Sequence, residues 1–218
     1  NGAGKSTLLD LCLGWRLPRV GVVEVAGKRL QNMSPRELGR TIGLVPQREN
    51  IRFDFSVEDY VLLGRGPHLR ALGMPGKEDR RIARDALDTV GMAELRKQSI
   101  MTLSGGEYQL MLIARSLTQQ PRILLLDEPT SQLDPAHRID ILRVLKQLSE
   151  RGITVLLTSH SPEIAALVSD EVFLLGSGRI CAYGSARSVL TEANLESVYR
   201  TEFRITWRNG HPHFMWEL

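Results

Sequence analysis

Short apolar runs alternate with amphipathic stretches along most of the chain. The runs over residues 42–45, 122–126 and 153–157 predict buried strands, and residues 20–25 predict a shorter one. Continuous apolar runs of this kind are typical of parallel sheets, whose strands are covered on both faces. Parallel neighbours need crossover connections, and helical patterns stand between these runs. The alternation therefore predicts an α/β layered core with a largely parallel sheet.

The helical patterns have recognisable ends. They cover residues 5–13, 103–119 and a stretch from Asp134 to Gly152. Asp134 is a good N-cap, and Pro135 suits the first helical position. Apolar residues at helical spacing mark one face of this last helix.

Two further segments differ from the alternating core. Residues 56–98 are helical in pattern, with breaks at Gly66-Pro67 and Pro75-Gly76, which predicts a helical insertion. Near the end, residues 203–208 and 211–216 flank Asn209-Gly210 and predict a hairpin. We expect one domain over residues 1–218. In it, residues 1–47 and 104–218 form the core and its C-terminal part, and 48–103 form the helical subdomain.

Composition narrows the class of protein. The 28 Lys and Arg residues nearly balance the 25 Asp and Glu residues, so the net charge of +3 lacks the excess expected of a dedicated nucleic-acid binder. No apolar run approaches the roughly 20 residues that cross a bilayer. Cys12 and Cys181 stand alone, which excludes a disulfide scaffold and predicts two buried thiols.

The chain begins without Met, inside what looks like a phosphate-binding motif. In this phosphate loop, glycines let backbone N–H groups converge on phosphate oxygens, Lys5 adds a positive charge, and Ser6 can bind magnesium. The loop consists of Asn1, Gly2, Ala3, Gly4, Lys5, Ser6 and Thr7. The alternative is a Gly-rich helix entry. The pattern's first Gly and the strand before it would lie upstream, so we expect an N-terminally incomplete chain.

Two carboxylates follow a buried strand directly. Asp127 and Glu128 come at the carboxyl end of residues 123–126, where ligands bind in open α/β sheets. Asp127 could hold magnesium, and Glu128 could orient or deprotonate a water that attacks the terminal phosphate. The alternative is a solvated turn, but two unpaired carboxylates beside a core are costly.

A second anion site is predicted at residues 104–107. Ser104 and Glu107 have capping-box spacing, while Gly105 and Gly106 leave N–H groups exposed at the positive end of a helix. A single nucleotide does not need two such sites. A symmetric pair of subunits would use both sites, because the second anion site of each subunit could contact the nucleotide bound by the other.

Together these motifs resemble the ATPase subunit of an ATP-binding cassette (ABC) transporter. In order, the matching motifs are Walker A (residues 1–7), the Q-loop Gln47, the signature (103–109), Walker B (123–127), the catalytic Glu128, the D-loop (131–134) and the switch His160. The resemblance implies a P-loop NTPase (RecA-like) core with a mostly parallel sheet, an inserted α-helical subdomain, and missing N-terminal strands.

The resemblance also implies roles for the site residues. ATP would be held by residues 1–7 and, from a second copy, by Ser104, Gly105, Gly106 and Asp134. Mg²⁺ would be held by Ser6, Gln47 and Asp127. Glu128, His160 and Gln47 would serve catalysis. Three positions depart from the family pattern: Tyr108, Leu110 and Gln132.

A narrower resemblance rests on Gly64 to His68 and on residues 189–199. These segments are similar to ATPases of importers for iron-siderophores, haem and vitamin B12. The implied partners are a second ATPase subunit in a homodimer, a transmembrane permease docking near residues 52–59, and indirectly a substrate-binding protein, with no nucleic acid. The implied location is the cytoplasmic face of the inner membrane, peripherally bound.

Two alternatives remain. One is a soluble ABC-type ATPase in translation or DNA repair. Such proteins usually carry two cassettes or a long coiled-coil insertion, and residues 47–103 show neither heptads nor a basic run. The other is a truncated, non-hydrolysing interaction module.

Overall fold

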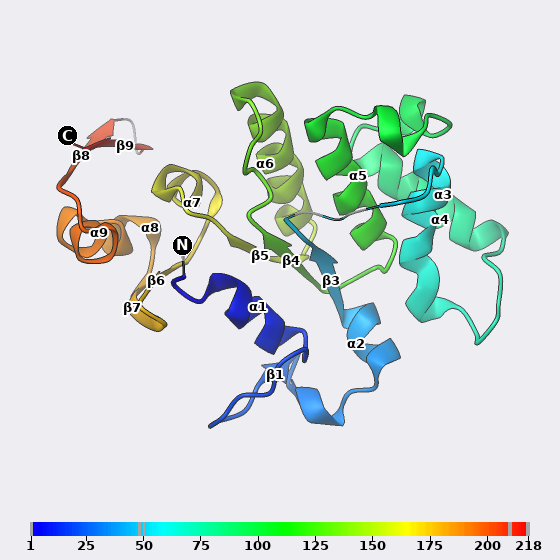
Figure 1. The fold of residues 1–218 in the computed structure, drawn as a ribbon, viewed down its shortest axis with the longest axis horizontal. Coiled ribbons are helices and arrows are strands. Elements are labelled where there is room, and N and C mark those ends of the chain that lie inside the picture. The colour runs from blue at the N-terminus through cyan, green and yellow to red at the C-terminus, as the bar shows by residue number, and fades with distance from the viewer. Residues whose placement is uncertain (1, 48, 50, 209–210, 217–218) are drawn as a thin grey trace. The chain divides into compact units, whose positions relative to one another are not determined.

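The computed structural model describes residues 2–47, 49, 51–208 and 211–216 (Figure 1). The chain forms two units, one of residues 9–158 and one of residues 1–8 with 159–218. Each unit has a core of its own, so each is described by itself.

A three-stranded parallel sheet organises residues 9–158. Its order is β3 (Ile42–Val45), β4 (Ile123–Asp127) and β5 (Thr154–Thr158), so β4 is central. This sheet confirms the predicted parallel arrangement, with strand ends within a residue or so of the expected ones.

Both faces of β4 are buried, because successive side chains of a strand point to opposite faces. Leu124 and Leu126 pack with α5 (Gly105–Leu117) and α6 (Pro135–Glu150). Leu125 packs in a second cluster with Leu9 of α1 (Lys5–Cys12) and with Leu30. Coverage on both faces explains why the strand has no polar residue before Asp127.

The helices begin where the sequence predicts. Asp134 caps α6 by accepting hydrogen bonds from the backbone N–H groups of Ala136 and His137 at 3.0 and 3.2 Å. In Figure 1, α6 follows β4, and α5 packs against both α6 and α3 (Val57–Leu62). Ahead of β3 stand η1 (Leu30–Asn32) and α2 (Pro35–Thr41).

The predicted helical insertion is present. The predicted break at Pro75-Gly76 is confirmed, whereas Gly66-Pro67 lies inside a 3₁₀ helix that ends at His68. It contains α3, η2 (Leu63–His68), α4 (Lys77–Thr89), η3 (Ala93–Leu95) and η4 (Ile100–Thr102). Helices α3, α4 and α5 pack on one another around buried apolar side chains, including Val61, Leu87 and Leu112.

Residues Gly64 to His68 form a cap on the C-terminus of α5. The Arg65 side chain is 7% exposed, and its Nη1 donates to the Thr118 carbonyl at 2.6 Å while its Nε donates to Asp79 Oδ1 at 2.8 Å. His68 Nε2 hydrogen-bonds the Gln119 carbonyl at 2.8 Å. These contacts satisfy carbonyl groups that the helix end leaves without an intrahelical partner.

The strand predicted over residues 20–25 is wrong for its first four residues. Only β1 (Glu24–Val25) forms, pairing with β2 (Lys28–Arg29). Val20 and Val22 are 92% and 57% exposed. Their apolar pattern resembles a strand, but a strand needs a pairing partner, and none forms with them in the described part of the chain.

The other unit is built from two antiparallel hairpins and three helices. Its elements are α7 (Pro162–Val168), β6 (Val172–Gly176), β7 (Arg179–Gly184), α8 (Ala186–Val189), α9 (Glu192–Tyr199), β8 (Phe203–Arg208) and β9 (His211–Trp216). The β8–β9 pairing confirms the predicted hairpin, although its turn at Asn209-Gly210 lies outside the described residues. The β6–β7 hairpin was not predicted.

The cysteine prediction holds only in part. Both thiols are free, but Cys12 is half-buried and Cys181 is exposed, so the expectation of two buried thiols is wrong for Cys181. It lies on β7, most of whose residues face solvent.

Candidate functional site

Three sequence-predicted residues meet at the carboxyl ends of β3 and β4. Gln47 follows β3, and its Nε2 donates to Glu128 Oε2 at 3.1 Å and to Ser131 Oγ at 3.4 Å. Asp127 is the last residue of β4, and Glu128 follows it. We call this group, with Thr158, the carboxyl edge.

Thr158 is the residue of this edge that sequence reasoning missed. It ends β5 directly beside Asp127, and its hydroxyl donates to Asp127 Oδ1 at 2.6 Å. The Thr158 hydroxyl oxygen also accepts the backbone N–H of Glu128 at 3.0 Å. Thr158 is buried, so it fixes both acidic residues from the neighbouring strand. The signal that could have identified Thr158 from the sequence was its place at the end of β5, the strand that follows β4 along the chain.

Glu128 has an unusual backbone. Its φ of 49° lies in the left-handed region, which costs an L-residue with a Cβ about 1–2 kcal/mol. Gln132 in the D-loop has a φ of 65°. Strained residues persist where the surroundings fix them, and the Thr158 hydroxyl holds the Glu128 N–H in this conformation.

The residues around Ser104 form the predicted capping box, which we call the signature turn (Ser104 to Glu107). Ser104 N–H donates to Glu107 Oε2 at 2.8 Å, and Glu107 N–H donates to Ser104 Oγ at 3.3 Å. The bond from the Ser104 N–H lowers the pKa of the Glu107 carboxyl. Ser104 and Gly105 are exposed while Gly106 is buried.

His137 joins the signature turn to the D-loop. Its Nδ1 lies 2.5 Å from Asp134 Oδ2. This contact raises the pKa of His137 and lowers that of Asp134. A Cβ added at Gly106 would come within 2.3 Å of His137 Cδ2, so the imidazole fills the space beside that glycine. His137 was not predicted to belong to the site, because no partner for it could be identified from the sequence.

The contact gives a testable prediction. Gly106→Ala should lower the thermal midpoint, since a Cβ cannot fit against the His137 ring. His137→Ala should recover part of that loss in the double variant, because it removes the clashing ring but leaves the His137 Cβ 2.8 Å away. Gly105→Ala is the matched control, since its Cβ would meet only Leu133 Cδ2 at 3.5 Å. Additive losses in the Gly106/His137 pair would contradict the contact.

The phosphate loop lies in the other unit, and Asn1 falls outside the described residues. Gly2 and Gly4 have φ values of 83° and 99°, which favour glycine. The Ala3 carbonyl accepts the Gly178 N–H at 3.2 Å, and α1 begins at Lys5. Lys5 is half-buried, whereas Ser6 and Thr7 are exposed on the first turn of that helix. This geometry leaves a helix start preceded by left-handed glycines, which suits a phosphate.

His160 also lies in this unit. Its side chain is exposed, and its carbonyl accepts the Tyr199 hydroxyl at 2.8 Å. The predicted residues thus form two groups, one per unit. Gln47, Ser104, Gly105, Gly106, Asp127, Glu128 and Asp134 belong to residues 9–158, while residues 2–7 and His160 belong to the other unit.

The oxygen donors present fit Mg²⁺ better than a zinc-type metal. In residues 9–158, Asp127 offers a carboxylate at a strand end. In the other unit, Ser6 offers a hydroxyl at a helix start. Mg²⁺ is commonly held by one or two protein oxygens together with substrate phosphates. In the described part of the chain, no group of three or more His, Cys, Asp and Glu residues could hold a metal ion alone.

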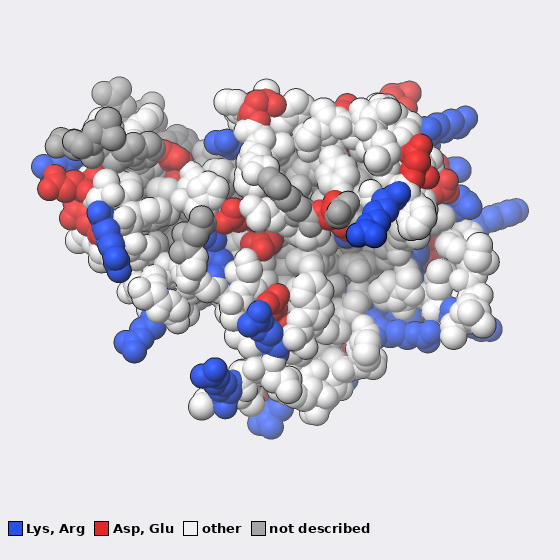
Figure 2. Space-filling model, viewed as in Figure 1, with Lys and Arg blue, Asp and Glu red and all other residues white. Residues whose placement is uncertain are grey.

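The surface adds two observations. In the view of Figure 2, Lys and Arg side chains are scattered among Asp and Glu side chains, without forming one basic patch. Of the helices in the described residues, none has the length and apolar character needed to span a bilayer.

Comparison with known proteins gives a family match. Residues 1–131 match the family model described as ABC transporter. The hemin import ATP-binding protein HmuV of Gloeobacter violaceus is 40% identical over 204 residues, which cover 90% of this chain and 74% of that protein. The iron(3+)-hydroxamate import ATP-binding protein FhuC of Bacillus subtilis is 36% identical over 206 residues, covering 94% and 77%.

Solved structures agree with the sequence matches. A metal-chelate type ABC transporter in an inward-facing conformation is similar with a TM-score of 0.89 and 34% identity, covering 100% of this chain and 83% of that one. An ATP-binding cassette solved as a dimer after hydrolysis, with bound ADP and Pi, has a TM-score of 0.72 and 28% identity, covering 85% and 82%. The predicted α/β cassette fold is thereby confirmed, while the absence of N-terminal strands and the domain boundaries stay predictions.

Proposed function

Because this chain belongs to the ABC transporter family as an ATP-binding, ATP-hydrolysing subunit, we propose that it energises import of an iron chelate, hemin or a cobalamin-type compound. The relatives named for hemin and iron(3+)-hydroxamate import support this substrate class. The observation that carries the hydrolytic role is the contact between Gln47 and Glu128 at the carboxyl edge.

Nucleotide binding is assigned to the phosphate loop. Its backbone N–H groups and Lys5 bind phosphate oxygens at the start of α1, where the helix dipole favours anions. Ser6, Asp127 and Gln47 would hold Mg²⁺, which supplies charge neutralisation on the phosphates when bound. Thr158 holds Asp127 in place through its 2.6 Å hydrogen bond.

Hydrolysis is assigned to the carboxyl edge and His160. Glu128 accepts the proton of the attacking water at a carboxylate oxygen, and the Gln47 amide fixes the orientation of that carboxylate. His160 would contact the terminal phosphate. The Glu128 carboxylate contacts Gln47 while Asp127 contacts Thr158, so the two acids have different partners.

We further propose that two copies act together. The exposed Ser104 and Gly105 at the start of α5, together with Gly106, would contact a nucleotide bound by the other copy. Asp134 would contribute through the D-loop. The dimeric cassette with bound ADP and Pi supports this arrangement by analogy.

The remaining partners follow from the importer assignment. They are a transmembrane permease, contacted near residues 52–59, and indirectly a substrate-binding protein. The subunit would then lie peripherally on the cytoplasmic face of the inner membrane. The rival ABC-type ATPase of translation or DNA repair would need a nucleic-acid or ribosome surface, and the net charge of +3 lacks the basic excess expected of a dedicated nucleic-acid binder.

Uptake in the source cell tests the proposal. Deleting the gene should reduce uptake of radiolabelled ferric hydroxamate, hemin or cobalamin to background for one of the three. Complementation with the wild-type gene should restore it, and Lys5→Ala should not, because the phosphates lose their cation. Lys146→Ala, an exposed lysine on α6, is the matched control and should restore uptake fully.

Other outcomes separate the alternatives. Unchanged uptake of all three compounds would exclude the substrate class. Full uptake with Lys5→Ala would contradict the role of the phosphate loop. If the wild-type subunit supports uptake without hydrolysing ATP in a phosphate-release assay, the non-hydrolysing module would replace the ATPase assignment.

A further inference from the structure

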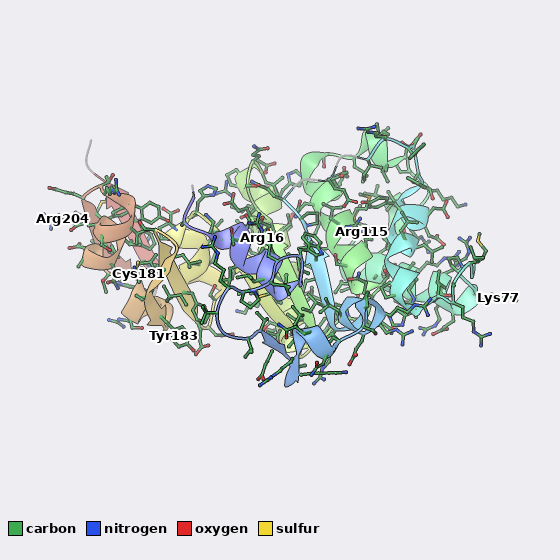
Figure 3. The ribbon with its side chains drawn as sticks, turned by 60° about the horizontal axis from the view of Figure 1, so that its bottom comes forward. Arg16, Lys77, Arg115, Cys181, Tyr183 and Arg204 are labelled. Carbon is green, nitrogen blue, oxygen red and sulfur yellow. The ribbon has the colours of Figure 1, made fainter. Side chains whose placement is uncertain are left out.

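The chain just after Gln47 is attached to two helices of the same unit. Glu49 Oε1 accepts a hydrogen bond from Arg115 Nη1 at 2.7 Å. The backbone carbonyl of Glu49 accepts the Tyr108 hydroxyl at 2.9 Å. Arg115, labelled in Figure 3, also donates to the Tyr60 hydroxyl at 2.7 Å. Glu49 is therefore held through both its side chain and its backbone.

Helix geometry explains why the two α5 residues meet one target. Tyr108 and Arg115 stand seven positions apart on α5, so they lie on one face of the helix, about two turns from each other. Tyr60 approaches from α3, with its ring 5.2 Å from the Arg115 guanidinium carbon. The three side chains form a single surface against Glu49.

These contacts are shielded from water. Tyr60 is 2% exposed, and the side chains of Arg115 and Glu49 are 20% and 32% exposed. Glu49 Oε2 is buried without a hydrogen-bond partner among the described residues, so its carboxylate depends on Arg115. Burial raises the pKa of both Tyr60 and Tyr108. At neutral pH the Tyr108 phenol is protonated and donates to the Glu49 carbonyl.

The attachment point lies close to the proposed hydrolytic contact. Glu49 stands two positions after Gln47, whose amide bonds Glu128. Fixing Glu49 therefore restricts where the Gln47 side chain can reach. The same helix α5 begins at the signature turn, so it joins the signature turn to the chain that carries Gln47.

We propose that Tyr108 and Arg115 are positioning residues that hold Gln47 against Glu128. The inference rests on the roles proposed for Gln47 and Glu128. It assigns a function to Tyr108, one of the three positions that depart from the family pattern, because its hydroxyl supplies the bond to the Glu49 carbonyl.

Tyr108→Phe is the central test, because it removes one hydroxyl and little volume. In steady-state ATP hydrolysis by the purified protein, we expect kcat to fall about twofold to tenfold, the range for one lost hydrogen bond of about 0.5–1.4 kcal/mol. The KM for ATP should change less than about twofold, since the phosphate loop is untouched. Tyr183→Phe removes the same group from an exposed hydroxyl bonded to Glu171 and should leave kcat unchanged.

A Gln47→Ala background tests whether Tyr108→Phe lowers kcat by acting through Gln47. In a Gln47→Ala protein, Tyr108→Phe should cause no further loss of kcat, because the residue through which it acts is gone. Equal losses in both backgrounds would overturn the positioning role and leave Tyr108 a merely structural residue. No loss in the wild-type background would overturn it as well.

Arg115→Met provides an independent check with a larger perturbation. It removes two hydrogen bonds, so the loss of kcat should exceed that of Tyr108→Phe and should also vanish in the Gln47→Ala background. If Gln47→Ala alone leaves kcat unchanged, both the proposed role of Gln47 and this inference fail. A wild-type protein that does not hydrolyse ATP would instead overturn the proposed function, before any variant is compared.

Discussion

Replacing Glu128 with glutamine is expected to leave ATP binding intact and to reduce hydrolysis by about two to four orders of magnitude, the usual contribution of a general base. The substitution keeps the size of the side chain and one oxygen that can accept the Gln47 amide. It removes the ability to take a proton from water. Binding should persist because the phosphate loop, which holds the phosphates in the proposed mechanism, is unchanged.

Solution mass with and without MgATP measures the consequence. A protein that binds ATP but does not cleave it should accumulate as a nucleotide-dependent dimer if two copies close on two nucleotides. Glu150→Gln, at the exposed end of α6, is the matched control and should hydrolyse ATP like the wild type. Normal turnover of the Glu128 variant would contradict the role assigned to this carboxylate.

The largest effect on stability is expected from Gly64→Ala. A Cβ at this glycine would lie 2.0 Å from the Arg115 carbonyl oxygen and 2.0 Å from Thr118 Oγ1. The first of these is backbone at the end of α5, so no side-chain rotation relieves it. We expect a loss of about 3 kcal/mol or more, at the upper end of overpacking effects. That is a large share of the roughly 5–15 kcal/mol that stabilises a typical domain.

Gly66→Ala, two residues away in the same segment, is the matched control. A Cβ there would meet nothing within 4 Å, so the unfolding free energy should change little. Urea unfolding of both variants gives the comparison. Similar midpoints for the two would show that Gly64 does not approach α5 as closely as the structure has it.

The sheet was predictable because its strands are apolar runs, and the central strand β4 is buried on both faces. A run without polar residues, such as residues 123–126, predicts a buried strand. In the structure, α5 and α6 pack against this run. Residues 20–23 fail for the complementary reason. Their apolar pattern is compatible with a strand, and Val20 and Val22 are nevertheless exposed. A strand forms only beside a partner strand, which the local sequence does not specify.

The candidate site was predictable where the order of motifs identified residues. Gln47 and Glu128 lie 81 positions apart, and their contact depends on the parallel pairing of β3 and β4. Thr158 escaped because a threonine at a strand end has many ordinary roles. His137 escaped because its significance lies in the space beside Gly106, which no sequence pattern reports.

The segment from Gly64 to His68 has a structural role that its resemblance to importer ATPases did not indicate. The sequence associated it with a class of importers. The structure assigns it a mechanical role, because Arg65 and His68 bond the carbonyl groups of Thr118 and Gln119 at the end of α5. The proposed substrate class therefore rests on the named relatives and not on this segment.

The left-handed backbone of Glu128 lowers the stability of the fold, whereas its carboxylate serves the proposed hydrolysis. Glycine would take the φ of 49° without the steric cost, so a carboxylate persists there against a folding penalty. A gene copy released from selection for hydrolysis gains stability by losing this side chain. Drift toward glycine or asparagine at position 128 is thus an expected early mark of cassettes that keep the fold after their catalysis has been abandoned.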